Sequence, residues 1–204
     1  MTALLLATRN RGKKRELEHF LSAAGASLRL LSLDDVAAGE DIEETGGTFA
    51  ENARLKAGHY SRVTGLDTLG DDSGLEVAAL GGRPGVLSAR YAGPGAGDGE
   101  RVAKLLDEMR DVADRRARFV SAVCISRRGA ALAQFVGTVE GLILREKRGA
   151  GGFGYDPLFL FPPLCRTFAE LPLAEKNRIS HRARALEQVR EFIRRGGLEE
   201  RPLV

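Results

Sequence analysis

The first 33 residues constrain the fold class more than any other part of the chain. Residues 3–7 form a short, continuous apolar run, which is typical of a buried strand. A polar segment follows over 8–13, and Leu17 and Leu21 then lie at helical spacing. A second apolar run covers 28–33. The order strand, polar loop, helix, strand predicts an α/β protein.

The composition is that of an ordinary globular protein. The chain has 204 residues, of which 43% are hydrophobic and 29% charged, and this length suits one α/β domain or two closely packed lobes. The formal net charge of +3 favours anionic ligands, although runs such as Arg115-Arg116 are typical of solvated faces. Trp is absent and only 6% of the residues are aromatic, so stacking platforms for bases are scarce. We therefore expect no nucleic-acid polymer as a partner.

The two cysteines and the N-terminus indicate a compartment. Cys124 and Cys165 lie far apart, with no Cys or His at metal-ligand spacing beside them, so they are expected to be reduced thiols. The N-terminus lacks the pattern of a signal peptide. No apolar run approaches the roughly 20 residues that span a bilayer. We expect a cytoplasmic protein that has no membrane partner.

Later segments continue the α/β pattern. Thr48 and Glu51 form a T-x-x-E capping box, which predicts a helix from Phe49 to about Val63 that ends at Gly65. The remaining predicted elements are a helix capped by Asp98, a pair of strands over 119–125 and 131–144 joined at Arg128-Gly129, a strand over 158–161 and a last helix from near Ser180.

One acidic segment interrupts two apolar stretches. Gly70-Asp71-Asp72-Ser73-Gly74 predicts a turn at this point. Adjacent carboxylates repel each other, and burying them without a cation costs free energy. Mg²⁺ would offset both charges and bridge phosphate oxygens. A solvated acidic turn is the more common explanation of an isolated Asp-Asp pair, so the surroundings must decide between the two.

Other polar clusters also lie at junctions between predicted elements, where ligands gather in open α/β sheets. The segment from Thr8 to Lys13 offers backbone N–H groups at a helix start, where a phosphate binds well, or it is a plain helix cap. Glu43-Glu44 forms a second acidic pair. In the loop Phe153-Gly154-Tyr155-Asp156, Phe153 can stack on a base, or the aromatic turn packs on the core.

The last cluster is basic. Lys176-Asn177 and Ser180-His181-Arg182 bring cationic side chains to a helix start, where the helix dipole disfavours them. Donors of this kind can bind an O6-type carbonyl or phosphates. The alternative is a Ser180 cap with charges on the surface.

Six ordered motifs cover essentially the whole chain. They are T-R-N-R-G-K from Thr8, E-E-T-G-G-T-F-A-E-N-A from Glu43, D-D-S-G-L from Asp71, P-G and S-A-R-Y between Pro84 and Tyr91, G-G-F-G-Y-D-P from Gly151, and S-H-R from Ser180. Together they resemble the inosine/xanthosine triphosphate pyrophosphatase family, whose members cleave non-canonical purine nucleoside triphosphates.

The resemblance implies a two-lobed α/β fold, with a long central mixed sheet flanked by helices and one domain over 1–204 whose lobes enclose the active-site cleft. It also implies a homodimer that depends on Mg²⁺. The reaction would convert ITP, dITP or XTP and water into the monophosphate and pyrophosphate, which cleanses the nucleotide pool.

The resemblance also assigns roles to single residues. Asp72 would be the proton acceptor and a metal ligand, and Glu43 the second metal ligand, with Glu44 as the alternative. The substrate contacts would be Thr8, Arg9, Asn10, Arg11, Gly12, Lys13, Ser73, Phe153, Gly154, Tyr155, Asp156, Lys176, His181 and Arg182. The sequence departs from the family pattern at Arg9 and Ala183, where Gly is usual.

Two other functions stay open from the sequence. The chain can be a pyrophosphatase for modified pyrimidine or methylated nucleotides, or a nucleotide-binding protein without turnover. The complete acidic set argues against the second of these.

Overall fold

The computed structural model describes residues 2–22, 28–36, 38–39 and 42–199. The described chain forms a seven-stranded sheet in the order β2-β1-β3-β4-β5-β6-β7. The strands are β1 (Thr2–Ala7), β2 (Leu28–Ser32), β3 (Asp67–Val77), β4 (Arg116–Arg127), β5 (Ala130–Ile143), β6 (Phe159–Phe161) and β7 (Arg166–Thr167). The α-helices are α1 (Arg11–Ser22), α2 (Phe49–Thr64), α3 (Asp98–Glu108), α4 (Leu173–Ile179) and α5 (His181–Arg194).

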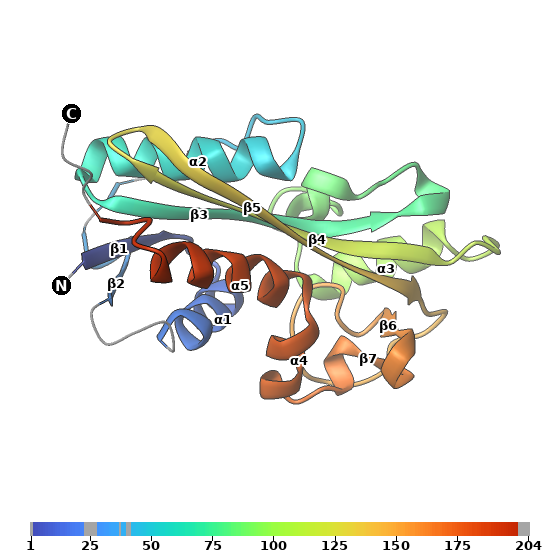
Figure 1. Ribbon diagram of the computed structural model, residues 1–204. Helices are drawn as coiled ribbons and strands as arrows, with labels where there is room; N and C mark the ends of the chain where they lie inside the picture. The colour runs from blue at the N-terminus through green and yellow to red at the C-terminus, as the bar shows by residue number, and fades with distance from the viewer. Residues whose placement is uncertain (1, 23–27, 37, 40–41, 200–204) are drawn as a thin grey trace. The chain divides into compact units, whose positions relative to one another are not determined.

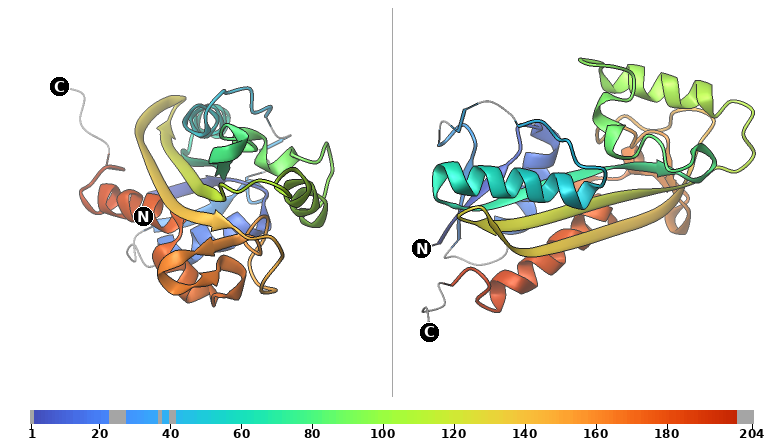
Figure 2. Two further views of the ribbon diagram at one scale, coloured as in Figure 1. Left: turned by 90° about the vertical axis from the view of Figure 1, so that its right-hand side faces the viewer. Right: turned by 90° about the horizontal axis from the view of Figure 1, so that it is seen from above.

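The sheet is mixed, as predicted. Strand β1 pairs in parallel with β2 and with β3, whereas β6 pairs antiparallel with β5 and with β7. Strands β4 and β5 run side by side as a long hairpin (Figure 2), and Arg128 and Gly129 at its turn both have positive φ, at 50° and 87°. Positive φ at both central residues is what the tightest hairpin turns require.

The chain divides into two compact units. The first unit contains Met1–Asp72, Ala122–Val136 and Arg184–Val204, and the second contains Ser73–Ser121 and Gly137–Ala183. Strand β3 passes from one unit to the other between Asp72 and Ser73.

In the first unit, α2 covers one face of β3, and α1 and α5 lie on the other face (Figure 1). Leu4 and Leu6 of β1 pack with Leu17 of α1, Leu69 of β3 and Leu186 of α5 in one apolar cluster. Helix α2 begins with the predicted capping box at Thr48 and ends at Gly65, whose φ of 71° suits glycine. Both ends of the predicted helix are therefore confirmed.

The second unit has its own core. Val102, Leu105 and Met109 from α3 and its C-terminal end pack with Phe119 of β4 and with Phe159 and Phe168, and all of these side chains are buried. Helix α4 and strand β7 were not predicted from the sequence. Asp98 is the first residue of α3, and Gly97 occupies the cap position that was expected for it.

The predicted turn at Gly70-Asp71-Asp72-Ser73-Gly74 is wrong, because these residues lie within β3. Both aspartates are buried, and neighbouring cationic and amide side chains compensate their charges, so the strand continues through them. Among the described residues, no helix combines the length and the apolar character needed to cross a bilayer.

Candidate active site

Asp71 and Asp72 lie on opposite faces of β3. Successive residues of a strand point to opposite sides of the sheet, and here Asp71 is 1% exposed and Asp72 is 5% exposed. Asp71 contacts α1, since the Lys13 ammonium lies 3.1 Å from its Oδ2. Asp72 contacts α2, since Asn52 donates from Nδ2 to its Oδ2 at 3.0 Å. One short segment thus presents a buried carboxylate to each layer of helices.

The two glycines of this segment explain why it stays extended. A Cβ at Gly70 would lie 2.5 Å from the carbonyl oxygen of Ala53 and 2.7 Å from the amide nitrogen of Ala57, both in α2. A Cβ at Gly74 would overlap the hydroxyl of Ser88. These glycines permit the close approach of neighbouring backbone and do not form a turn.

The electrostatics of this region depend on two lysines. Burial raises the pKa of Asp72, the charges of Lys13 and Lys56 oppose that rise, and the charge of Glu44 adds to it. Burial alone would lower the pKa of Lys56, but Asp71, Glu44 and Asp72 together raise it. Three carboxylates and two ammonium groups therefore form one coupled group, which we call the acidic cluster: Glu44, Asp71, Asp72, Lys13 and Lys56.

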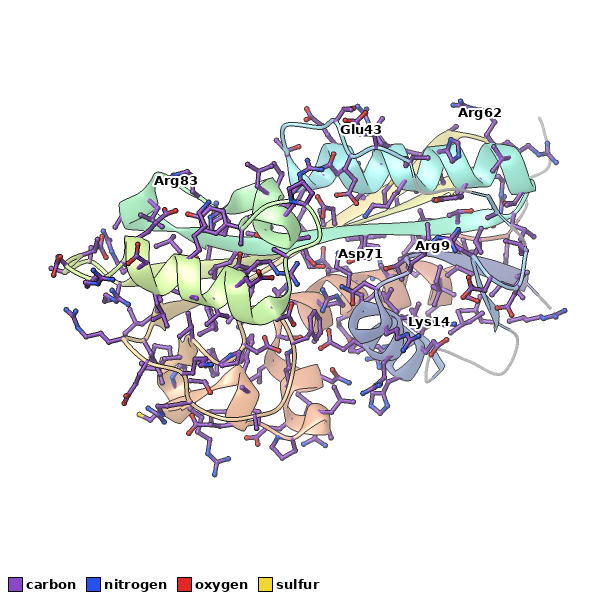
Figure 3. All side chains as sticks on the ribbon, turned by 180° about the vertical axis from the view of Figure 1, so that it is seen from behind. Arg9, Lys14, Glu43, Arg62, Asp71 and Arg83 are labelled. Atoms are coloured by element: carbon purple, nitrogen blue, oxygen red, sulfur yellow. The ribbon has the colours of Figure 1, made fainter. Side chains whose placement is uncertain are left out.

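Glu44 belongs to the acidic cluster, whereas Glu43 does not. The Lys56 ammonium lies 2.6 Å from Oε1 of Glu44. Glu43 is exposed on the loop before α2, apart from Asp71 (Figure 3). Glu44 is therefore the acid of this pair that is placed to act together with Asp72.

Sequence reasoning missed Lys56 and Asn52. Lys56 follows Asn52 by four residues on α2, so both lie on the same side of that helix. Asn52 is fully buried, and its Oδ1 accepts a hydrogen bond from the Gly46 amide at 2.8 Å. The sequence did contain a signal for them. Asn52 and Lys56 lie one helical turn apart, close after an acidic loop and the start of a capped helix.

The predicted phosphate loop forms the start of α1. Asn10 caps the helix, because its Oδ1 accepts from the Lys13 amide at 3.0 Å. Thr8 Oγ1 accepts from the Asn10 amide at 3.3 Å. Arg9 donates to Oδ1 of Asp34 at 3.1 Å and to the Gly39 carbonyl. Arg11 and Gly12 are the first two residues of the helix.

In the second unit, an ion pair organises the predicted base-recognition residues. The Lys176 ammonium lies 2.6 Å from Oδ2 of Asp156, and both side chains are only 3% exposed. The same Oδ2 accepts from the Phe153 amide at 2.9 Å. Lys176 also lies 4.7 Å from the centre of the Phe153 ring. Asp156 thus fixes a lysine and an aromatic ring in one place.

Two more basic residues are buried in the same unit. The Arg182 guanidinium donates to Ser73 Oγ at 2.8 Å and lies 5.7 Å from the Phe153 ring. The His181 ring stacks on Phe119 with centroids 4.7 Å apart and an interplanar angle of 14°. We call Phe153, Asp156, Lys176, His181 and Arg182 the basic–aromatic cluster. Lys176 is paired with Asp156 in this cluster, and side chains of these types can donate hydrogen bonds to an electron-rich ligand.

Tyr155 and Gly154 have structural contacts of their own. The Tyr155 side chain is part of the core and donates to the Ser88 carbonyl at 3.0 Å, and burial raises the pKa of its phenol. The Gly154 amide donates to Asp98 at 2.7 Å, and Gly154 has a φ of 60°. The loop conformation therefore depends on glycine, while Tyr155 anchors it to the core.

The described residues contain no group of three or more His, Cys, Asp and Glu side chains arranged to hold a metal. Mg²⁺ requires fewer protein ligands, because it commonly takes one or two carboxylates together with substrate phosphates and water. Glu44 and Asp72 offer hard oxygen ligands of this kind, and the raised pKa of Asp72 indicates that its anion would gain from a nearby cation. The donor set fits a magnesium ion.

Comparison with known proteins agrees with this arrangement. The model of the Ham1 family matches residues 4–192. The dITP/XTP pyrophosphatase of Gloeobacter violaceus is 48% identical over 96% of both chains, and that of Thermus thermophilus is 49% identical over 95% of this chain and 92% of its own. A HAM1 protein from Coxiella burnetii has a solved structure that superposes with a TM-score of 0.88 at 42% identity, covering 96% of this chain and all of its own. The family resemblance drawn from the six motifs is thereby confirmed, and the chain belongs to the Ham1 family.

Proposed function

We propose that this protein is a Mg²⁺-dependent pyrophosphatase that hydrolyses ITP, dITP and XTP to the monophosphate and pyrophosphate. The relatives that cover nearly the full chain are named dITP/XTP pyrophosphatases. The observation that carries the proposal is the burial of two adjacent carboxylates between Lys13, Lys56 and Asn52. Burying these charges costs folding free energy, and a bound charged ligand would offset part of that cost.

The acidic cluster would act on the triphosphate. Lys13 and the first amides of α1 would bind phosphate oxygens, as helix starts commonly do. Glu44 and Asp72 would hold Mg²⁺, which supplies charge neutralisation for the phosphates and acidifies water when it is bound. We assign the second metal ligand to Glu44 and not to Glu43, because Glu44 interacts electrostatically with Asp72.

Asp72 would also accept the proton of the attacking water. An ordinary carboxylate is a weak base at neutral pH, and burial makes Asp72 a stronger one. Asn52 occupies Oδ2 of Asp72. This hydrogen bond orients the carboxylate that would take the proton.

The basic–aromatic cluster would recognise the base. Phe153 would stack on the purine, and Lys176, His181 and Arg182 would donate hydrogen bonds to O6. Adenine has an amino group at this position, so it would leave buried donors unpaired, a mismatch worth roughly 10⁴-fold in sites built around a hydrogen bond. Asp72 and Ser73 are consecutive in the chain, so we propose that the acidic cluster and the basic–aromatic cluster act on one nucleotide.

The assembly is proposed as a homodimer in the cytoplasm. The homodimer comes from the family resemblance, and the cytoplasmic location comes from the cysteine pattern and the N-terminal sequence. Sedimentation analysis of the purified protein tests the dimer.

Pyrophosphate release from ITP, XTP, GTP, ATP, dUTP and methylated dTTP, each with and without Mg²⁺, tests the function. We expect turnover of ITP and XTP that requires the metal, and loss of turnover in Asp72→Asn with nucleotide binding retained. Equal rates on all six nucleotides would refute the purine assignment. No pyrophosphate from any of them would refute the enzymatic one.

A further inference from the structure

A pocket of about 460 Å³ lies in the second unit at the C-terminal end of α3, and none of its residues belongs to the acidic or the basic–aromatic cluster. Ala103 and Leu106 form its apolar part, and Met109, whose side chain is buried in the core, also lines it. Its polar lining consists of Asp107, Arg110, Arg115 and Arg145. The lining therefore carries three positive charges and one negative charge, a net charge of +2.

Arg115 is held in place by neutral groups. Its guanidinium donates to the carbonyl oxygens of Ile143 at 2.8 Å and Leu144 at 2.7 Å, and also to that of Met109. These bonds explain its orientation, and the carbonyl at the helix end interacts favourably with a cation. They leave its full charge in place, because within the described part of the chain this guanidinium binds no carboxylate.

Arg145 adds a second charge at the same place. It donates to the Arg110 carbonyl at 2.9 Å and, among the residues that the structure describes, has no carboxylate partner. Burial lowers the pKa of Arg115, and the charge of Arg145 lowers it further, so the two guanidinium groups repel each other. Asp107, the one acid of the lining, is already paired with Arg110. An anion between Arg115 and Arg145 would relieve this repulsion.

We propose that this pocket binds a phosphate monoester, with the phosphate between Arg115 and Arg145 and the organic part against Ala103 and Leu106. Guanidinium groups bind phosphate oxygens in pairs, and a phosphate dianion matches the net charge of the lining. The volume lies in the range of small-molecule sites, roughly 300–1,000 Å³, and is large for inorganic phosphate alone. A nucleoside monophosphate has both a phosphate and an organic part large enough to contact the apolar lining. The proposal does not depend on the catalytic assignment.

Arginine labelling with phenylglyoxal tests the proposal at the level of single residues. The wild-type protein is labelled with and without IMP at constant ionic strength, and peptide mass spectrometry gives the labelling rate of each arginine. At an IMP concentration ten times Kd, we expect Arg145 to be labelled about tenfold more slowly. Arg116, which is exposed and paired with Asp114, serves as the internal control and should be unaffected. Ligand bound only at the acidic cluster would leave Arg145 unprotected and overturn the proposal.

Parallel samples with inosine, ribose 5-phosphate and inorganic phosphate show how much each part of IMP contributes to the protection of Arg145. Inosine should not protect, and ribose 5-phosphate should protect less than IMP. Equal protection by inorganic phosphate would refute the role of the apolar lining. Equilibrium dialysis of IMP should show one site fewer per chain in Arg145→Gln than in the wild type or in Arg116→Gln, and an unchanged number would refute the pocket.

Discussion

The side-chain amide of Asn52 on α2 donates to Oδ2 of Asp72 at 3.0 Å, and it accepts from the Gly46 amide through its other atom. Asn52 therefore joins the loop that carries Glu44 to the carboxylate proposed as the base. Asn52→Leu should lower kcat for ITP by 10- to 100-fold, as loss of such supporting contacts typically does. KM should change little, and the pH profile of kcat should move, because the amide stabilises the Asp72 anion.

The control for Asn52 is Gln134→Leu. Gln134 also donates a hydrogen bond to α2, to the Ala50 carbonyl at 3.2 Å, but it touches no acid of the cluster. A kcat that falls equally in both variants would show that α2 packing, and not the orientation of Asp72, had been disturbed.

The raised pKa of Asp72 predicts that the residue proposed as the base lowers the stability of the fold at neutral pH. A pKa that is raised in the folded state contributes stability at pH values below the unfolded value, near 3.8, and this stability is lost as pH rises through the folded pKa. At pH 7 without metal, the ionised carboxylate therefore destabilises the fold. Asp72→Asn should raise Tm at pH 7 in EDTA, and the gain should shrink towards pH 4.

Asp114→Asn should change Tm in the opposite direction from Asp72→Asn, and it serves as the control. The hydrogen bond and charge of Arg116 lower the pKa of Asp114 to about 2. Its contribution to stability is present above the unfolded pKa and is lost as pH falls, so Asp114→Asn should lower Tm at pH 7. If Asp72→Asn also lowered Tm in EDTA, the view of Asp72 as an electrostatically costly residue would be wrong.

Gly70→Ala should destabilise the protein by at least about 2 kcal/mol, because the added methyl group meets the backbone of α2. Displacement of α2 should also reduce activity, since Asn52 and Lys56 move with it. Chemical denaturation and ITP turnover measure both effects.

Gly99→Ala is the matched substitution for Gly70→Ala. Gly99 lies in α3 with open space around its Cβ position, so alanine should stabilise by about 0.5–1 kcal/mol. Equal effects of the two substitutions would contradict the packing argument.

The stack of Phe119 on His181 predicts an effect on selectivity. Phe119→Leu should let His181 leave its position, and the ratio of kcat/KM for ITP over ATP should fall by about tenfold, since an aromatic contact contributes about 0.5–1.5 kcal/mol. Phe135→Leu loses a comparable contact, with Phe192 in the first unit, and should leave the ratio unchanged. A ratio that is unchanged in Phe119→Leu would remove Phe119 from base recognition.

The sequence predicted most of the fold because hydrophobic periodicity and capping are local signals. The capping box at Thr48 and the turn at Arg128-Gly129 were recognised from a few adjacent residues, and the structure contains both. Helix α4 was missed because it has seven residues and no side-chain cap, so its sequence carries little periodic signal.

The acidic segment was misread because its explanation is not local. Glycine and aspartate together favour turns in isolation, and only the contact of Gly70 with α2 and the charges of Lys13 and Lys56 make the extended form stable. Those partners lie far away in sequence. The same reason hid Lys56 and Asn52, whose role depends on which strand α2 covers.

Side chains alternate between the two faces of the sheet along β3, and this alternation fixes which helix layer each aspartate contacts. Leu69 packs with α1, Gly70 meets α2, Asp71 meets Lys13 and Asp72 meets Asn52. A deletion of one residue between Asp67 and Gly70 would exchange these faces, so that each acid would point towards the helix layer of the other. The loss or gain of a single residue in this stretch should therefore misplace both carboxylates at once, whereas one substitution alters one side chain.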